Sequence, residues 1–326
     1  MGNLLFQTGS QLAFLYLFLF SGMFFSRKNL IKKETDSGIA VLLAQFFLPC
    51  MLVSSLSEQF DRNLLNSYVL YLIAGILTVL VLWYPIKLLA KRLTTDKDSC
   101  QRGILSYAML FPNISFFGYP LVEATLPQFY LPLMIYSLPF TVVANTLGLG
   151  LLSCKKKEKT WNNILSPTVI GTLLGILLVL LMVKLPKPFS SFLSSASDCT
   201  GPLAMLFTGL VLGRPVEHTS KKQDTAVLAI VMLFRLILIP ALVSGGILLV
   251  CHIAKLPYEL AITAATALCL PCGMNMIFLT GGQDEGNATT IRSLGAKCVL
   301  ISNSISLITV PLIYAAISFF IEFPSC

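Results

Sequence analysis

The sequence predicts an all-α polytopic membrane protein of ten transmembrane helices, built as two inverted five-helix repeats with broken, crossing helices 4 and 9. The first observation is composition: 56% of the 326 residues are apolar, 12% are charged, and mean hydropathy is +0.81. Soluble domains carry roughly 25% charged residues, so this chain has too little polar surface for a water-soluble domain. The other two observations are regularly spaced apolar runs and two proline-interrupted runs at matching positions.

Ten apolar runs are long enough to cross a bilayer, since a helix needs about 20 apolar residues to do so. We predict spans at 11–25, 38–56, 67–89, 103–126, 129–153, 167–183, 189–212, 225–251, 258–280 and 299–320. Lys and Arg cluster in the loops after the odd-numbered runs, including a loop at 284–297, and are sparse after the even-numbered runs. The positive-inside rule then predicts a multi-pass protein of the cell membrane with both termini on the non-cytoplasmic side.

The net charge of +8 is explained by this orientation pattern, and we expect no nucleic-acid partner because no fold presents the basic clusters. With two histidines in the chain, we expect no metal site and no cofactor. Cys269 and Cys272 form a C-x-x-C pattern inside an apolar run, where packing at a helix break is the favoured interpretation.

Five spans per half is an odd number, so the second half has the opposite orientation to the first. We predict a first repeat at 1–153, a lysine-rich cytoplasmic linker at 154–163 and a second repeat at 164–326. The interrupted runs are the fourth of each half, and such matched interruptions are typical of inverted-repeat transporters and their binding sites.

The two interruptions are the predicted substrate site. A proline removes a helical hydrogen bond, and each break exposes a half-helix amino end whose partial positive charge suits a carboxylate. The asparagines can donate to such an anion or cap the broken helices, and the glycines can allow close backbone approach or pack helices. The candidate residues are Pro112, Asn113, Gly118 and Pro120 in run 4, and Pro271, Gly273 and Asn275 in run 9.

Arg235 is the only basic residue deep inside a predicted span. Its burial costs at least ~2.5 kcal/mol, so it should face the protein interior and have an anionic partner, either the substrate or Asp198. It is therefore a candidate for a structural ion pair or for substrate or ion coupling. Gln45, Asn145 and Asn303 are further coupling candidates, although interhelical hydrogen bonds explain them equally well.

Three stretches give the chain its resemblance to a known family. Residues 113–121, N-I-S-F-F-G-Y-P-L, resemble the pattern N-x-G-F-x-G-x-P-L of the auxin efflux carrier family, which includes bacterial malate and malonate permeases. Pro271 and Asn275 resemble its P-x-x-x-N break, and residues 304–312, S-I-S-L-I-T-V-P-L, are similar to its S-x-x-S-L-x-x-x-P-L ending. Ser115 departs from the usual glycine, so no substrate is carried over from a relative.

The resemblance implies a ten-helix fold in which spans 4 and 9 cross at the substrate site. It also implies a scaffold of spans 1, 2, 6 and 7, a mobile unit formed by the other spans, elevator-like movement and carboxylate substrates. The sequence does not decide whether transport is coupled to H⁺ or Na⁺, or whether the protein forms a homodimer.

The sequence therefore predicts a secondary transporter, or permease, of a small organic anion. One alternative is a sodium- or proton-coupled carrier of the bile-acid symporter type, or an antiporter, which should have paired acids near the breaks. A membrane enzyme would need clustered His, Asp or Glu, which the sequence lacks. A non-transporting membrane sensor with the same fold is the remaining alternative.

Overall fold

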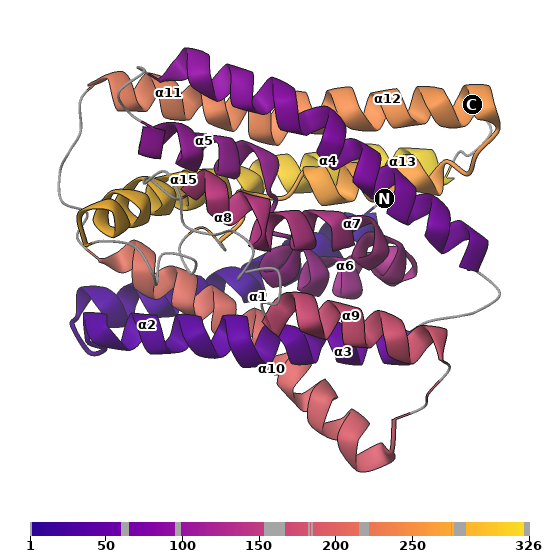
Figure 1. Ribbon diagram of the computed structural model, residues 1–326, viewed down its shortest axis with the longest axis horizontal. Coiled ribbons are helices and arrows are strands. Elements are labelled where there is room, and N and C mark those ends of the chain that lie inside the picture. The colour runs from indigo at the N-terminus through magenta and orange to yellow at the C-terminus, as the bar shows by residue number, and fades with distance from the viewer. Residues whose placement is uncertain are drawn as a thin grey trace.

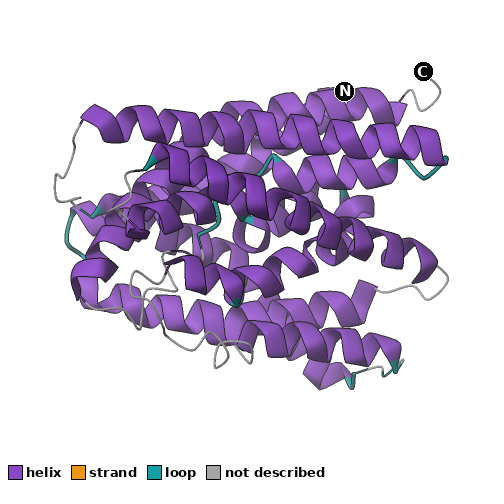
Figure 2. Cartoon of the chain, turned by 45° about the horizontal axis from the view of Figure 1, so that its top comes forward, coloured by secondary structure: helices purple, strands orange, loops and turns teal. Residues whose placement is uncertain are grey.

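The structure, a computed structural model, describes residues 2–59, 65–94, 99–152, 167–181, 183, 185–214, 222–274, 276 and 285–322. Every regular element in these residues is a helix, as Figure 2 shows. The all-α class is therefore confirmed. Helices suit this composition because each satisfies its own backbone hydrogen bonds, which an apolar environment requires.

Two of the three π-helical segments belong to the first half of the chain. That half forms α1 (Gly2–Arg27), α2 (Lys33–Leu42), the π-helical η1 (Leu43–Phe47), α3 (Leu48–Gln59), α4 (Leu65–Leu93), α5 (Ser99–Leu110), the π-helical η3 (Ile114–Gly118), α6 (Tyr119–Thr125), the short 3₁₀ turn η4 (Pro127–Phe129), α7 (Tyr130–Asn145) and α8 (Leu147–Leu152). The second half forms α9 (Pro167–Leu180), α10 (Lys187–Gly213), α11 (Lys222–Leu233), the π-helical η6 (Phe234–Leu238), α12 (Ile239–Ala254), α13 (Glu259–Leu268) and α15 (Glu285–Glu322).

Four helical stretches of the described chain are long and apolar enough to cross a membrane: Glu34–Ser57, Ser67–Leu93, Lys187–Gly213 and Ala226–Ala254. A fifth candidate is the pair Leu294–Ser306 and Ile308–Ile317, bent by 49°. The bend lies four residues before Pro311, whose ring clashes with the carbonyl of residue 307. The number of spans and the inverted relation of the halves stay predictions.

The predicted loop at 284–297 is wrong from residue 285 onward, because α15 begins there as a helix. The loop was predicted because the stretch contains charged residues such as Arg292 and Lys297. A helix can continue past the apolar boundary of a span, since charge alone does not end it.

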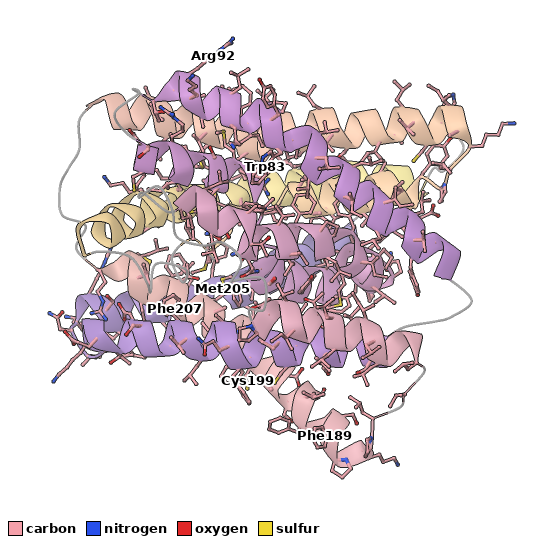
Figure 3. The ribbon with its side chains drawn as sticks, viewed as in Figure 1. Trp83, Arg92, Phe189, Cys199, Met205 and Phe207 are labelled. Atoms are coloured by element: carbon pink, nitrogen blue, oxygen red, sulfur yellow. The ribbon has the colours of Figure 1, made fainter. Side chains whose placement is uncertain are left out.

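The helices form two layers in Figure 1. The lower layer holds α1, α2, α3, α9 and α10, and the upper layer holds α4, α5, α11, α12, α13 and α15, with α6, α7 and α8 between them. Figure 3 shows the side chains of α10: Met205 and Phe207 are buried, whereas Cys199 and Phe189 are exposed. The lower layer corresponds to predicted spans 1, 2, 6 and 7.

Two glycines set the distance between α1 and α10. A Cβ atom on Gly22 would lie 2.1 Å from the carbonyl oxygen of Leu206, and one on Gly209 would lie 1.9 Å from that of Leu19. Small residues allow helix backbones to approach in this way, and van der Waals packing then holds helices together in lipid. The same layer has a polar tie at its edge, where Arg214 donates to both carboxylate oxygens of Asp36 at 2.8 and 3.1 Å.

Each π-helical segment ends two residues before a proline. η1, η3 and η6 precede Pro49, Pro120 and Pro240. Each segment closes with an N–H that donates to the carbonyl five residues back. This wider turn suits the proline, which cannot donate and crowds the carbonyl four residues back. Proline permits the π turn without forcing it, since Pro85 and Pro202 lie inside α-helices.

We expect Gly209→Ala to lower the melting temperature of the detergent-purified protein by several degrees. The added methyl group must push α1 and α10 apart, and overpacking costs about 1–3 kcal/mol. Gly246→Ala is the matched control, because a Cβ there meets nothing within 4 Å. Equal melting temperatures for the two variants would contradict the close helix contact.

Candidate functional site

Two interrupted segments from opposite halves of the chain pair with each other at the centre of the site. Pro112 and Cys272 form an isolated antiparallel bridge. The Asn113 N–H donates to the Pro271 carbonyl at 2.8 Å, and the Gly273 N–H donates to the Phe111 carbonyl at 2.8 Å. The two breaks therefore satisfy part of each other's backbone.

The prolines explain why both helices stop here. α5 ends at Leu110 and α13 at Leu268, just before Pro112 and Pro271. The residue preceding a proline is disfavoured in the α-helical region, so each chain becomes extended. Free backbone groups would cost several kcal/mol in an apolar interior, and the reciprocal hydrogen bonds remove part of this cost.

The two glycines at the crossing make room for close neighbours, a backbone at Gly273 and a leucine side chain at Gly118. A Cβ on Gly273 would lie 2.9 Å from the carbonyl oxygen of Phe111, and one on Gly118 would lie 2.4 Å from Cδ1 of Leu270. Both positions are buried, as are Pro112 and Pro271. Close packing of the crossing therefore accounts for both glycines.

Asn113 combines a backbone hydrogen bond across the crossing with an unpaired side-chain amide donor. It is 2% exposed, and its Nδ2 has no hydrogen-bond partner in the described structure. It stands directly before η3 but makes no side-chain cap. A buried donor without a partner costs about 1–3 kcal/mol. Its counterpart in the second break, Asn275, lies outside the described residues.

Neighbouring helices hold the crossing from both layers. The Cys272 N–H donates to Oγ of Ser302 on α15 at 3.1 Å. From α10, the Thr208 hydroxyl contacts the sulfur of Met274, and Gly201 lies against the ring of the partly buried Pro120. Sequence reasoning missed Ser302 and Thr208. The polar run 302–304 inside an apolar stretch was a usable signal for Ser302, whereas Thr208 has none.

Arg235 is buried against backbone carbonyls. It is 0% exposed, its Nη2 donates to the Leu270 carbonyl at 2.9 Å, and its Nη1 donates to the Met109 carbonyl at 3.4 Å. The ion pair with Asp198 that the sequence suggested is not formed. Asp198 is exposed on α10, because the face of α10 that packs inward carries Ala196 and Thr200 instead.

The side chains of the other polar candidates, Asn145, Asn303 and Gln45, make no hydrogen bond with one another in the described structure. Asn145 Nδ2 donates to the Thr141 carbonyl at 2.8 Å, and Asn303 Nδ2 donates to the Val299 carbonyl at 2.7 Å, each within its own helix. The sequence left hydrogen bonds between helices as an alternative role for Asn145 and Asn303. In the structure the Nδ2 atom of each residue instead donates within its own helix. Gln45 is exposed in η1.

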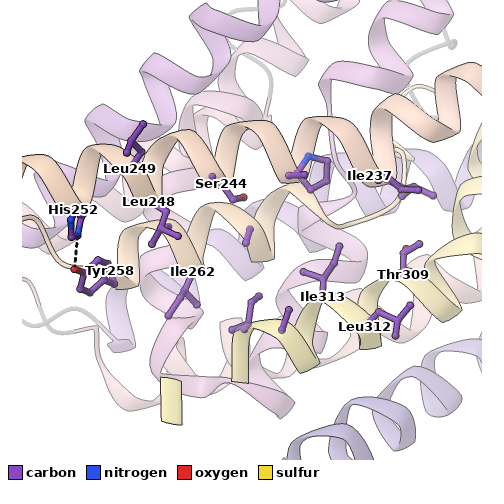
Figure 4. Close-up of a pocket in the computed structure, with 18 residues that line it drawn as sticks. Ile237, Ser244, Leu248, Leu249, His252, Tyr258, Ile262, Thr309, Leu312 and Ile313 are labelled. Atoms are coloured by element: carbon purple, nitrogen blue, oxygen red, sulfur yellow. Dashed lines mark hydrogen bonds between the residues drawn. The ribbon is translucent and has the colours of Figure 1, made fainter. Parts of the chain in front are cut away.

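A large cavity of about 840 Å³ lies away from the crossing, between α12, α13 and α15 (Figure 4). Its lining among the described residues is mostly aliphatic, without Lys or Arg, and its polar groups include His252 and Tyr258, whose Nδ1 and hydroxyl oxygen lie 3.5 Å apart. Such a lining does not suit a small anion, which needs donors or positive charge.

Comparison with known families decides the protein's class. A family model described as a membrane transport protein matches residues 9–154 and 151–314. The chain belongs to the auxin efflux carrier family. This family consists of membrane transporters, and the apolar helices agree with an integral membrane protein. Comparison with curated proteins found no match for this carrier-family chain.

We expect Ser302→Ala to destabilise this carrier-family protein by about 1–3 kcal/mol, because the Cys272 N–H loses its acceptor at the buried crossing. Chemical or thermal unfolding of the purified protein measures the loss. Ser304→Ala is the matched control, since its exposed hydroxyl donates only to the Leu300 carbonyl of its own helix. A Ser302 variant as stable as the control would show that the contact does not support the crossing.

Proposed function

We propose that the protein is a secondary transporter that carries a small organic anion, most simply a carboxylate, by alternating access. The observation that carries this proposal is the unpaired, buried amide donor of Asn113 at the crossing of the two breaks. The family match supports transport as the general activity. We infer no catalytic step.

The electrostatics of the break favour an anion. η3 and α6 form one continuous helical stretch, Ile114 to Thr125, whose amino end follows Asn113. The first N–H groups of a helix lack partners within it, and this end carries a partial charge of roughly +0.5. A carboxylate has two oxygens that can accept from such N–H groups and from Asn113 Nδ2.

The burial of the crossing supports alternating access. Pro112, Asn113, Pro271 and Gly273 are all buried, so a substrate reaches them only after surrounding helices move. We propose that the upper layer, together with α6, α7 and α8, moves against the lower one in an elevator-like manner. The contacts of α10 with Pro120 and Met274 would then form part of the sliding interface.

Coupling to H⁺ or Na⁺, as in a symporter of the bile-acid type, is the alternative mechanism, and a non-transporting sensor is the alternative function. A proton antiporter is less favoured, because Asp198 is exposed and stands away from Arg235. We place the protein in the cell membrane with both termini on the non-cytoplasmic side, on the strength of its basic loops.

We expect the wild-type protein in liposomes to take up an organic anion, and Asn113→Ala to reduce the rate about tenfold or more, as loss of a buried hydrogen bond worth at least ~1.4 kcal/mol would do. Uptake of a panel of radiolabelled mono- and dicarboxylates, with and without sodium and proton gradients, measures this. Thr172→Ala is the control, because its buried hydroxyl bonds only within α9. Wild-type uptake by the Asn113 variant would remove the proposed site, and no uptake of any anion by the wild type would favour the sensor.

We also propose a homodimer through the outer face of the lower layer. Asp198 is exposed near the middle of α10, and Gln45 is exposed in η1. A carboxylate facing lipid at that depth costs at least ~2.5 kcal/mol, so a protein surface is a more favourable neighbour. Light scattering of the detergent-purified protein should give twice the chain mass of 35.7 kDa, and a monomer mass would refute the dimer.

A further inference from the structure

We propose that Arg235 is a tethered counter-cation of the crossing. Its guanidinium neutralises the carboxyl ends of α5 and α13 together, and a variant without this side chain would bind a free guanidinium ion in its place. This inference concerns the stability of the crossing and does not depend on which substrate, if any, the protein carries.

The contacts of Arg235 are those of a donor that replaces missing helical N–H groups. In an uninterrupted helix the N–H of Asn113 would donate to the Met109 carbonyl, four residues back. Here that N–H donates across the crossing to Pro271, and Arg235 Nη1 lies 3.4 Å from the Met109 carbonyl oxygen. Its Nη2 donates at 2.9 Å to the carbonyl of Leu270, which follows the end of α13.

The charge of Arg235 matches the charge of its surroundings. The carboxyl end of a helix carries about −0.5 elementary charge, so two such ends together present about −1. α5 and α13 have 12 and 10 residues, long enough for this effect. Among the described residues Arg235 pairs with no carboxylate: Nη1 and Nη2 donate to carbonyl oxygens, and the buried Nε has no partner. A single guanidinium is therefore the complement of the two ends.

A π-helical turn orients the side chain of Arg235 toward the crossing. Arg235 is the second residue of η6, the π-helical segment before Pro240. A π turn inserts one residue, which rotates the flanking side chains by roughly 100° relative to a regular helix. η6 packs against both α5 and α15. The side chain thus points from one helix of the upper layer to the carbonyls of two broken ones.

Arg235 acts through the backbone of the crossing, so it is a positioning residue. Its burial is complete, and its hydrogen bonds lead to the last turn of α5 and to Leu270, two residues past α13. The unpaired donor of Asn113 stands instead before the amino end of η3. Arg235 and Asn113 therefore have different roles at the breaks. A permanent cation serves the carbonyls, and the amide and N–H groups are left for an anion.

The test is chemical rescue of thermal stability in the purified full-length protein. Arg235→Ala removes the charge and leaves a space, Arg235→Lys keeps a charge, and Arg235→Met fills the space without charge. Each variant is melted with low-millimolar guanidinium chloride, with urea as the neutral molecule of similar shape, and with sodium chloride at equal ionic strength. Arg214→Ala is the matched control, because it loses a guanidinium at the protein edge, where Asp36 remains accessible to water.

We expect Arg235→Ala to melt several degrees below the wild type, and guanidinium to restore most of the loss in a saturable manner while urea and sodium do not. Arg235→Lys should stay closer to the wild type than Arg235→Met, and guanidinium should leave Arg214→Ala unchanged. Rescue by urea to the same extent, no rescue at all, or a Met variant as stable as the wild type would overturn the proposal.

If Arg235→Ala does not yield folded protein, the Lys and Met variants decide the question. More folded protein from Lys than from Met supports the counter-cation, and equal yields overturn it. A failed rescue leaves anion uptake by the wild type unaffected, and absent uptake leaves the melting data unaffected. The two proposals can therefore fail independently.

Discussion

The structure depends on a pair of reciprocal backbone hydrogen bonds between two broken helices. Asn113 and Pro271 share one bond, and Gly273 and Phe111 share the other. In an apolar surrounding a helix cannot be interrupted unless something receives the freed groups. Each break receives the groups of the other, so neither interruption is stable by itself and the two halves of the chain must meet at this point.

The crossing needs several supports because two hydrogen bonds do not satisfy every freed group. Ser302 accepts from the Cys272 N–H, and Arg235 donates to the Met109 and Leu270 carbonyls. Asn113 Nδ2 is left without a partner. The unpaired donor of Asn113 stands before the amino end of η3, whereas Arg235 donates to two carbonyls of the crossing, and this arrangement supports the proposed anion ligand.

The surrounding helices divide into close contacts within a layer and smaller contacts between layers. Gly22 and Gly209 bring α1 and α10 into backbone contact in the lower layer. Between α10 and the segments beside the breaks, the contacts include those of Thr208 with Met274 and of Gly201 with Pro120. The backbone contact of α1 with α10 suits the lower layer to the part of a fixed body in the proposed elevator-like movement.

The sequence by itself determined the helical class, the membrane environment and the place of both breaks. Composition and proline act locally, so Pro112 and Pro271 could be read as interruptions without knowledge of the fold. The loop predicted from the charged residues after 284 is wrong, since α15 already begins at Glu285. Only the tertiary structure decided the partners of Arg235, because a buried charge is matched by whatever groups the fold brings near it. Here these are two helix ends, not the carboxylate of Asp198, and backbone carbonyls carry no mark in an amino-acid sequence.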